Sequence, residues 1–259
     1  MRRRDFLAAS CLAGAAPLAR LARGMEMVKP KKQLLELRVY SVGSEAQQKR
    51  LEEFLAKAMV PALGRIGISP VGVFRPAKEG DLGLYVLLPH GSAESVVTCT
   101  ARLLADAKFA RDGAAWLDLP MSDPLYRRVE SSLLLAFDGV PKVELHSRKD
   151  SRIFQLRIYE SHSLKKGQKK IEMFNTGGEL GVFRLCDMNP VFFGEALVGT
   201  KVPNLTYMLV FDDDEARKVA WGKFLKHPDW KKLKSDPQYK DTVSNITNIF
   251  LKPAPCSQI

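Results

Sequence analysis

Two short stretches of the sequence place an arginine and a tyrosine two residues apart. Arg38 and Tyr40 form the first pair, and Arg157 and Tyr159 repeat it about 120 residues later. In an extended strand, residues two apart share one face. Arginine pairs with carboxylates, and tyrosine offers an aromatic ring and a hydroxyl donor. The two pairs therefore predict a binding site for an anionic, aromatic or quinone-like ligand.

A second candidate is the segment His227-Pro228-Asp229-Trp230. Histidine exchanges protons near neutral pH, so His227 could act as an acid or a base, with Trp230 beside a ligand. The structural alternative is that Pro228 begins a short helix and Trp230 packs against the core. No carboxylate or nucleophile is placed beside His227 by spacing, so no catalytic residue is assigned.

Motifs for metal, phosphate and nucleophilic chemistry are absent from the sequence. The four histidines lack the spacing of a metal site, and no Cys-x-x-Cys, Gly-x-Ser-x-Gly or glycine-rich phosphate loop occurs. We therefore predict no metal. The cofactor stays unknown, with haem as the one candidate considered, and we lean towards a protein that is not an enzyme.

The formal net charge of +11 comes partly from two lysine clusters. The clusters comprise lysines 165, 166, 169 and 170, and lysines 223, 226, 231, 232 and 234. We expect both on outward faces of helices, in water or against an anionic surface. Because aromatic residues are not interleaved with them, except around Trp230, we expect no nucleic-acid partner.

Residues 1–24 have the pattern of a twin-arginine signal peptide. Arg3 and Arg4 precede Phe6-Leu7, and an apolar run follows over residues 8–18. That run is too short to span a bilayer, which needs about 20 residues. The pattern predicts an exported, periplasmic or extracellular protein with no transmembrane segment in the mature chain. A lipid anchor at Cys11 is the less favoured alternative.

Residues 34–138 are predicted to form a unit with the order strand, helix, strand, strand, helix, strand. Alternation of apolar and polar residues indicates the strands, and apolar residues at helical spacing indicate the helices. The expected strands are 35–40, 71–74, 82–88 and 129–137, and the expected helices begin at Ser44 and Ser92.

The same order recurs over residues 152–253, after a linker at 139–151. Residues 25–33 are expected to be a linker and residues 254–259 a tail. The glycines at 177 and 178 interrupt the first helical pattern of this second unit, which predicts a bend there.

Each unit is predicted to be ferredoxin-like, with a four-stranded antiparallel sheet and both helices on one face. The other face would be an apolar patch larger than soluble proteins tolerate. Packing the two open faces together gives an α+β fold, a single-chain barrel that mimics a dimer. If Leu156 and Ile158 lie under the helices, the arginines and tyrosines point into the barrel, joined by Asn245. The alternative is that each arginine pairs with a nearby acid such as Glu36 or Glu130.

Several segments of the sequence resemble the NIPSNAP family, in particular its secreted bacterial members with tandem domains. They include residues 35–40, Asn189 to Glu195, His227 to Trp230 and Val243 to Asn248. The resemblance covers residues 34–259. It implies the dimeric α+β barrel fold and an undefined activity, with no catalytic set to carry over. The wider superfamily includes cofactor-free monooxygenases and haem-binding enzymes.

Two functional hypotheses follow. The first is a module, monomeric or homodimeric, that binds a small ligand or a protein partner. The alternative is a cofactor-free monooxygenase-like or haem-handling enzyme that uses the barrel interior. A large interior cavity with converging polar groups would favour the enzyme, whereas a filled interior would remove its site.

Overall fold

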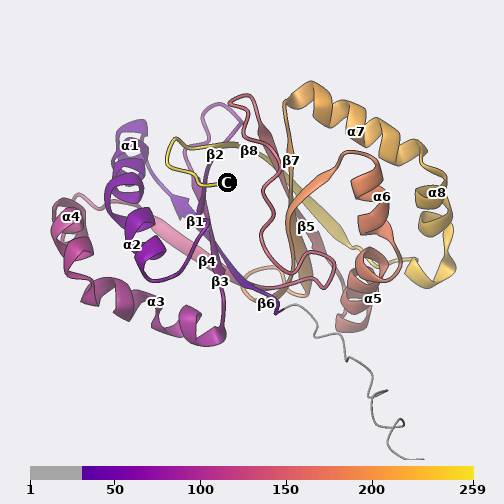
Figure 1. Cartoon of the computed structure of the whole chain (residues 1–259), viewed down its shortest axis with the longest axis horizontal. Coiled ribbons are helices and arrows are strands. Elements are labelled where there is room, and N and C mark those ends of the chain that lie inside the picture. Colours follow the sequence, from indigo (N-terminus) through magenta and orange to yellow (C-terminus); the bar gives the residue numbers. More distant parts are fainter. Residues whose placement is uncertain (1–30) are drawn as a thin grey trace, which may run out of the picture. The chain divides into compact units, whose positions relative to one another are not determined.

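The computed structural model describes residues 31–259, which form one compact unit. The signal peptide predicted over residues 1–24 lies outside them. Eight antiparallel strands close into a barrel in the order β1-β3-β2-β8-β5-β7-β6-β4, with helices on two opposite flanks (Figure 1). No helix within residues 31–259 is long and apolar enough to cross a membrane.

The first repeat supplies four strands and the helices of one flank. Ser44 and Ser92 cap α1 and α3 by accepting hydrogen bonds from Gln47 N and Ser95 N. The elements are β1 (Leu34–Ser41), α1 (Glu45–Phe54), the π-helical turn η1 (Leu55–Met59), α2 (Val60–Arg65), β2 (Gly72–Pro76), β3 (Leu84–His90), α3 (Ala93–Ala105), α4 (Ala107–Leu117) and β4 (Arg128–Ala136).

The second repeat supplies the other four strands and the opposite flank. Ser163 and Asp213 cap α5 and α7 in the same way, at positions equivalent to Ser44 and Ser92. The elements are β5 (Ile153–Glu160), α5 (Leu164–Asn175), α6 (Glu179–Leu185), β6 (Asn189–Val198), β7 (Asn204–Phe211), α7 (Asp214–Lys226), α8 (Pro228–Ser235), the 3₁₀ turn η2 (Pro237–Tyr239) and β8 (Asn245–Pro253).

Two equivalent seams close the barrel. Strand β2 of the first repeat pairs with β8 of the second, and β4 of the first pairs with β6 of the second. Since β4 and β8 are each the last strand of a repeat, and β2 and β6 each the second, the seams are related by pseudo-twofold symmetry. The predicted fold, two ferredoxin-like repeats packed as a single-chain barrel, is confirmed.

The barrel interior is a packed apolar core. Strands of both repeats contribute to it, and Phe74 meets Phe154 with ring centroids 4.7 Å apart. Its other buried members are Leu35, Leu37, Leu87, Leu134, Ala136, Leu156, Val191, Phe192, Met208, Val210, Leu251 and Ile259. The space inside the barrel is therefore filled mainly by apolar side chains, and Asn204 and Thr206 are buried polar residues on the same face of β7 as Met208.

The prediction for the faces of β1 and β5 is wrong. Leu37 and Leu156 point into the barrel, whereas Tyr40 and Tyr159 belong to the cores that lie under the helices. Both faces of each strand are buried, one inside the barrel and one beneath helices. Alternation in the sequence separates the two faces but does not say which of them faces the helices.

Helix boundaries differ from the sequence prediction at one place and agree at another. The helix expected to begin at Ser92 ends at Ala105, and a further helix that the sequence did not predict follows it, because Asp106 ends α3 and caps α4 by accepting from Phe109 N at 2.9 Å. The bend predicted at the two glycines is confirmed, with Gly178 at φ 96° between α5 and α6.

Candidate functional site

A pocket of about 620 Å³ lies in the first repeat, between the outer face of the sheet and the helices. This volume is in the range of small-molecule sites, roughly 300–1,000 Å³. The lining residues are Glu36, Arg38, Tyr40, Phe54, Met59, Thr100, Leu103, Leu104, Phe109, Trp116, Leu117, Leu119, Pro124, Leu125, Tyr126, Val129 and Ser131.

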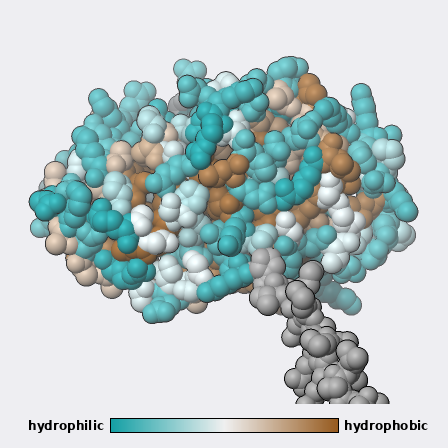
Figure 2. All heavy atoms as spheres, in the orientation of Figure 1, coloured by the Kyte–Doolittle hydropathy of each residue, from teal (hydrophilic) through white to brown (hydrophobic). Residues whose placement is uncertain are grey.

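Aromatic and aliphatic side chains form the walls of the pocket. The Phe54 ring of α1 has its centroid 6.0 Å from the rings of both Phe109 and Trp116, which α4 contributes. At the rim, Leu104, Leu117 and other apolar residues remain exposed, so the pocket opens to the outside. Figure 2 shows hydrophobic patches of this kind on an otherwise mostly hydrophilic face.

Polar side chains form the floor of the pocket. Glu36, Arg38 and Tyr40 alternate along β1 and so share its helix-covered face. Ser131 of β4 lies directly opposite Arg38 in the strand pairing, which brings its hydroxyl to the same floor. The sequence analysis identified Arg38 and Tyr40, but it missed Ser131 and the aromatic walls because their convergence depends on packing between distant elements.

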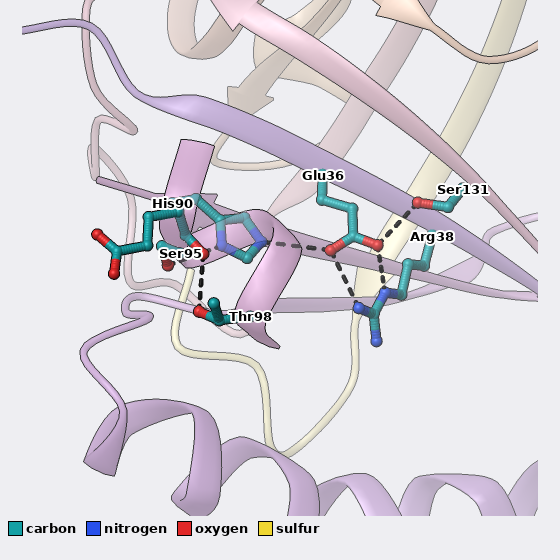
Figure 3. A network of polar contacts seen from close by, with 7 residues as sticks. Glu36, Arg38, His90, Ser95, Thr98 and Ser131 are labelled. Carbon is teal, nitrogen blue, oxygen red and sulfur yellow. Dashed lines mark hydrogen bonds and ion pairs between the residues drawn. The ribbon is translucent and has the colours of Figure 1, made fainter. Parts of the chain in front are cut away.

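Glu36 is the centre of a hydrogen-bond network (Figure 3). Arg38 donates to its carboxylate twice, from Nε at 2.7 Å and from Nη2 at 3.0 Å, and the Ser131 hydroxyl donates at 2.8 Å. His90 Nε2 lies 3.3 Å from Glu36 Oε2, and its Nδ1 lies 3.0 Å from Ser95 Oγ. Because an ionised carboxylate only accepts, Nε2 carries the proton. Both carboxylate oxygens are thus fully engaged.

Interactions with neighbouring groups keep Glu36 and Arg38 ionised. Burial by itself would raise the pKa of Glu36, but hydrogen bonds from His90, Arg38 and Ser131 and the charge of Arg38 hold it at about 2. The pKa of Arg38 is raised, because its pairing with Glu36 outweighs the effect of burial. At neutral pH the two side chains form a bidentate ion pair whose charges cancel.

Tyr40 is a neutral donor at the edge of this ion pair. Burial raises the pKa of its phenol, and the nearby charge of Arg38 opposes that rise only in part. Its ring meets Tyr126 edge to face, with centroids 5.2 Å apart. The Tyr40 hydroxyl lies close enough to Arg38 to interact with it. Because a phenol both donates and accepts, its O–H can still donate to a ligand.

The equivalent place in the second repeat is built differently. Gln155 replaces Glu36, so Arg157 has no carboxylate partner within residues 31–259, and its Nε is buried without a hydrogen bond. Its guanidinium carbon lies 5.2 Å from the Tyr159 ring centroid and 4.8 Å from that of Trp221. The alternative that each arginine pairs with an acid is right for Arg38 and wrong for Arg157.

Aromatic rings occupy the space around Tyr159. Its hydroxyl accepts a hydrogen bond from the Tyr207 hydroxyl at 3.0 Å, and Tyr207 stacks on Phe193 with centroids 4.5 Å apart. Phe174 and Phe183 complete this buried cluster. The second repeat thus fills with its own side chains a space that the first repeat leaves partly open.

A buried ion pair was missed by the sequence analysis. Lys170 is 4% exposed and donates to Glu179, itself 2% exposed, at 2.7 Å. The prediction that Lys170 belongs to an outward basic face is wrong, because its side chain is buried and its Nζ lies 4.5 Å from the Phe174 ring centroid. Nothing in the sequence connects the two residues, since the bend at the glycines brings them together.

The remaining predicted site residues do not join the pocket lining. Asn245 lies at the exposed start of β8, where its amide donates to Glu160 at 2.8 Å. Asn248 and Ile246 of β8 pair with Arg157 and Tyr159, so Asn245 lies on the other face of the sheet. His227 caps α8 by accepting from Asp229 N at 3.3 Å, and Trp230 packs on Phe224 at 4.5 Å. These are the contacts that the structural alternative predicts, with a helix that begins at Pro228 and a Trp230 ring packed against the core.

Metal and haem ligation find no support in the lining of the pocket. Residues 31–259 contain no group of three side chains that could hold a metal ion. No histidine or cysteine lines the pocket, and His90 is fully buried with both ring nitrogens engaged. The residues present do not fit a haem held by a histidine.

Solved structures share this fold at low sequence identity, whereas comparison with curated proteins finds no match. A "putative monooxygenase" from Fusobacterium nucleatum subsp. nucleatum has a TM-score of 0.58 and 9% identity, over 86% of this chain and 93% of that one. Another, from Lactobacillus acidophilus, has a TM-score of 0.58 and 11% identity, over 86% and 94%. An anthrone oxidase-like protein has a TM-score of 0.54 and 10% identity, over 87% and 93%.

At these identities the likeness concerns the fold alone. The family comparison is more specific, because residues 154–258 match the NIPSNAP family model. This range runs from β5 to the end of the last strand and beyond it, so it spans the whole second repeat. Residues 154–258 are therefore similar to a NIPSNAP domain.

Proposed function

We propose that the first repeat binds a small, uncharged aromatic molecule that carries a hydroxyl or carbonyl oxygen. The observation that carries this proposal is the pocket of about 620 Å³, where aromatic walls meet a floor made by Arg38, Tyr40 and Ser131. Pockets with apolar walls and a few converging polar groups are typical of ligand sites. The protein then acts as a binding module.

The charge of the floor favours an uncharged ligand. Glu36 neutralises Arg38 through Nε and Nη2, so a carboxylate ligand would meet a negative charge beside the positive one. Two donors remain for an oxygen of the ligand, namely Arg38 Nη1 and the Tyr40 hydroxyl. A phenol or a quinone-like carbonyl satisfies them without a net charge.

The same geometry argues for binding rather than catalysis. A general base works best when its pKa is near the operating pH. Glu36 has a pKa of about 2 and both its oxygens are occupied, while burial keeps Tyr40 protonated. The monooxygenase-like alternative then has fold likeness in its favour but no poised acid or base, and fold does not imply function.

The test is calorimetric titration of residues 31–259 with 2-naphthol. We expect one molecule to bind, and Tyr40→Phe to weaken binding about fivefold, because one hydrogen bond worth about 1 kcal/mol is lost. Tyr159→Phe is the matched control in the second repeat and should leave binding unchanged. Equal affinities for wild type and Tyr40→Phe, or no binding to the wild type, would overturn the proposal.

We further propose that the protein is exported by the twin-arginine route. The support is the pattern Arg3-Arg4-x-Phe6-Leu7 with a short apolar run behind it. Fractionation of bacterial cells that express the full chain tests this. Replacing Arg3 and Arg4 by lysine should leave the protein in the cytoplasm, whereas unchanged export would contradict the route.

A further inference from the structure

The second repeat contains a side chain in the place that corresponds to the pocket. Helices α3 and α7 have the same length, thirteen residues, and each follows the third strand of its repeat. Counting from their first residues, the eighth position is Thr100 in α3 and Trp221 in α7. The two positions are therefore equivalent, and they differ by a large aromatic side chain.

Trp221 reaches the polar face of β5. Its Nε1 donates to Gln155 Oε1 at 2.7 Å, and its ring centroid lies 4.8 Å from the guanidinium carbon of Arg157. Gln155 and Arg157 are the third and fifth residues of β5, as Glu36 and Arg38 are of β1. The indole thus covers the counterparts of two residues on the pocket floor.

In the first repeat, the space that corresponds to the one filled by the Trp221 ring is open. Thr100 lines the pocket together with Glu36 and Arg38, and its short side chain remains exposed. The pocket therefore exists where the other repeat inserts an indole. An aromatic ring on an arginine, with a donor directed at the strand, is a combination that this scaffold already stabilises.

We infer that the ligand of the first repeat is a planar bicyclic aromatic molecule of indole size, lying with its ring face on the Arg38 guanidinium as Trp221 lies on Arg157. This inference rests on the proposed function and specifies its substrate class. The N–H or O–H of the ligand points to the Glu36 and Ser131 end of the floor. Ser131 donates to Glu36 Oε1, and its own hydroxyl oxygen can accept the hydrogen of the ligand.

The size of the ligand is tested by comparing indole and 2-naphthol with phenol. The second ring adds apolar surface that the pocket removes from water, so we expect the bicyclic compounds to bind at least about tenfold more tightly than phenol. Equal affinities for phenol and 2-naphthol, which carry the same hydroxyl and differ by one ring, would overturn the inference and leave the proposed function standing. Failure of all three compounds to bind the wild type would overturn both.

The place of the ligand is tested by exchanging the two residues. Thr100→Trp should fill the pocket and weaken indole binding at least about a hundredfold, while the melting temperature stays equal or rises. Thr100→Val is the matched control and should bind indole within about threefold of the wild type. Unchanged indole binding by a folded Thr100→Trp variant would overturn the inference.

The reciprocal exchange gives a second readout. Trp221→Thr should open the equivalent place in the second repeat, so that the number of indole molecules bound rises from one to two. If this variant is too unstable for titration, indole should raise its melting temperature more than that of the wild type. If no second molecule binds and indole stabilises the variant no more than the wild type, the equivalence on which the inference depends is contradicted.

Discussion

The helix-covered polar faces of β1 and β5 differ at one position. Position three of the first strand is Glu36 in one repeat and Gln155 in the other. The carboxylate holds Arg38 in a bidentate pair. The amide cannot do this, and it accepts instead from Trp221, whose ring covers Arg157. The choice of acid or amide therefore accompanies an open or a filled site.

Glu36 makes the stability of the protein sensitive to acid. Its pKa is about 2 in the folded protein against an ordinary value of 4.5. Because the folded value is the lower one, this stabilisation is fully present above about pH 4.5 and is lost as the pH falls towards 2. The difference corresponds to roughly 3 kcal/mol. Urea unfolding at pH 7 and pH 3 should show a loss of about 2 kcal/mol, because pH 3 is still above the folded pKa.

The matched control for the acid dependence is Glu36→Gln, which copies Gln155. It should be less stable than the wild type at pH 7, because an ion pair is lost. Its free energy of unfolding should change less between pH 7 and pH 3. The same pH dependence in both proteins would show that other carboxylates determine it.

The buried ion pair of the second repeat gives another test. Burial raises the pKa of Glu179 against the attraction of Lys170, which indicates that the pair is costly to bury. Breaking it with Glu179→Met alone should cost about 3–5 kcal/mol. In the first repeat the positions that correspond to Lys170 and Glu179 hold apolar residues. Leu51 follows its helix cap at the same distance as Lys170, and Met59 precedes the second strand of its repeat as Glu179 does.

Replacing both partners should therefore be far milder. We expect the double variant Lys170→Leu with Glu179→Met to be within about 1–2 kcal/mol of the wild type, or more stable. Chemical denaturation of the single and double variants measures the difference. A double variant as unstable as the single one would show that the charges are needed for more than each other.

Among the elements, the helix after α3 builds one wall of the pocket. Helix α4 has eleven residues and its counterpart α8 has eight. The additional turn carries Trp116 and Leu117, both of which line the pocket. The length of this helix, in addition to the residue at position 100, thus shapes the site.

The cap of α4 should consequently affect binding. Asp106 accepts from Phe109 N and pairs with Arg65 at 2.7 Å, so Asp106→Ala should loosen the start of α4, lower the melting temperature and weaken 2-naphthol binding. Asp213→Ala removes a capping aspartate from α7, in the other repeat, and should lower the melting temperature without changing the affinity. Equal effects of both variants on binding would contradict a specific role of α4.

For the molecule as a whole, the two repeats need each other. Each sheet has one face in the barrel core, and the seams β2–β8 and β4–β6 pair their edges. A single repeat would expose an apolar face and two unpaired edges. Folding therefore requires a partner sheet.

The pseudo-twofold seams predict what an isolated repeat does. Residues 142–259 expressed alone should form a homodimer, with β6 of each copy against β8 of the other. Analytical ultracentrifugation measures the mass. A folded, soluble monomer would contradict the view that the seams and the shared core drive assembly.

The sequence alone was sufficient to predict much of this architecture. Repetition of the strand-helix pattern and of Arg-x-Tyr predicted two equivalent units, and the apolar face of each predicted that they pack into one barrel. These features depend on local periodicity and on the amount of apolar surface, both of which a sequence displays directly.

Only the tertiary structure decided which face of each strand is the polar floor, and whether that floor is open. Strand alternation is symmetric between the faces, so Arg38 and Arg157 could not be assigned to the helix side from the pattern. Whether the floor is covered depends on Thr100 and Trp221, which lie on helices more than sixty residues along the chain from the arginines they approach. Side-chain volume brought across such a distance is a property of packing, and no local pattern records it.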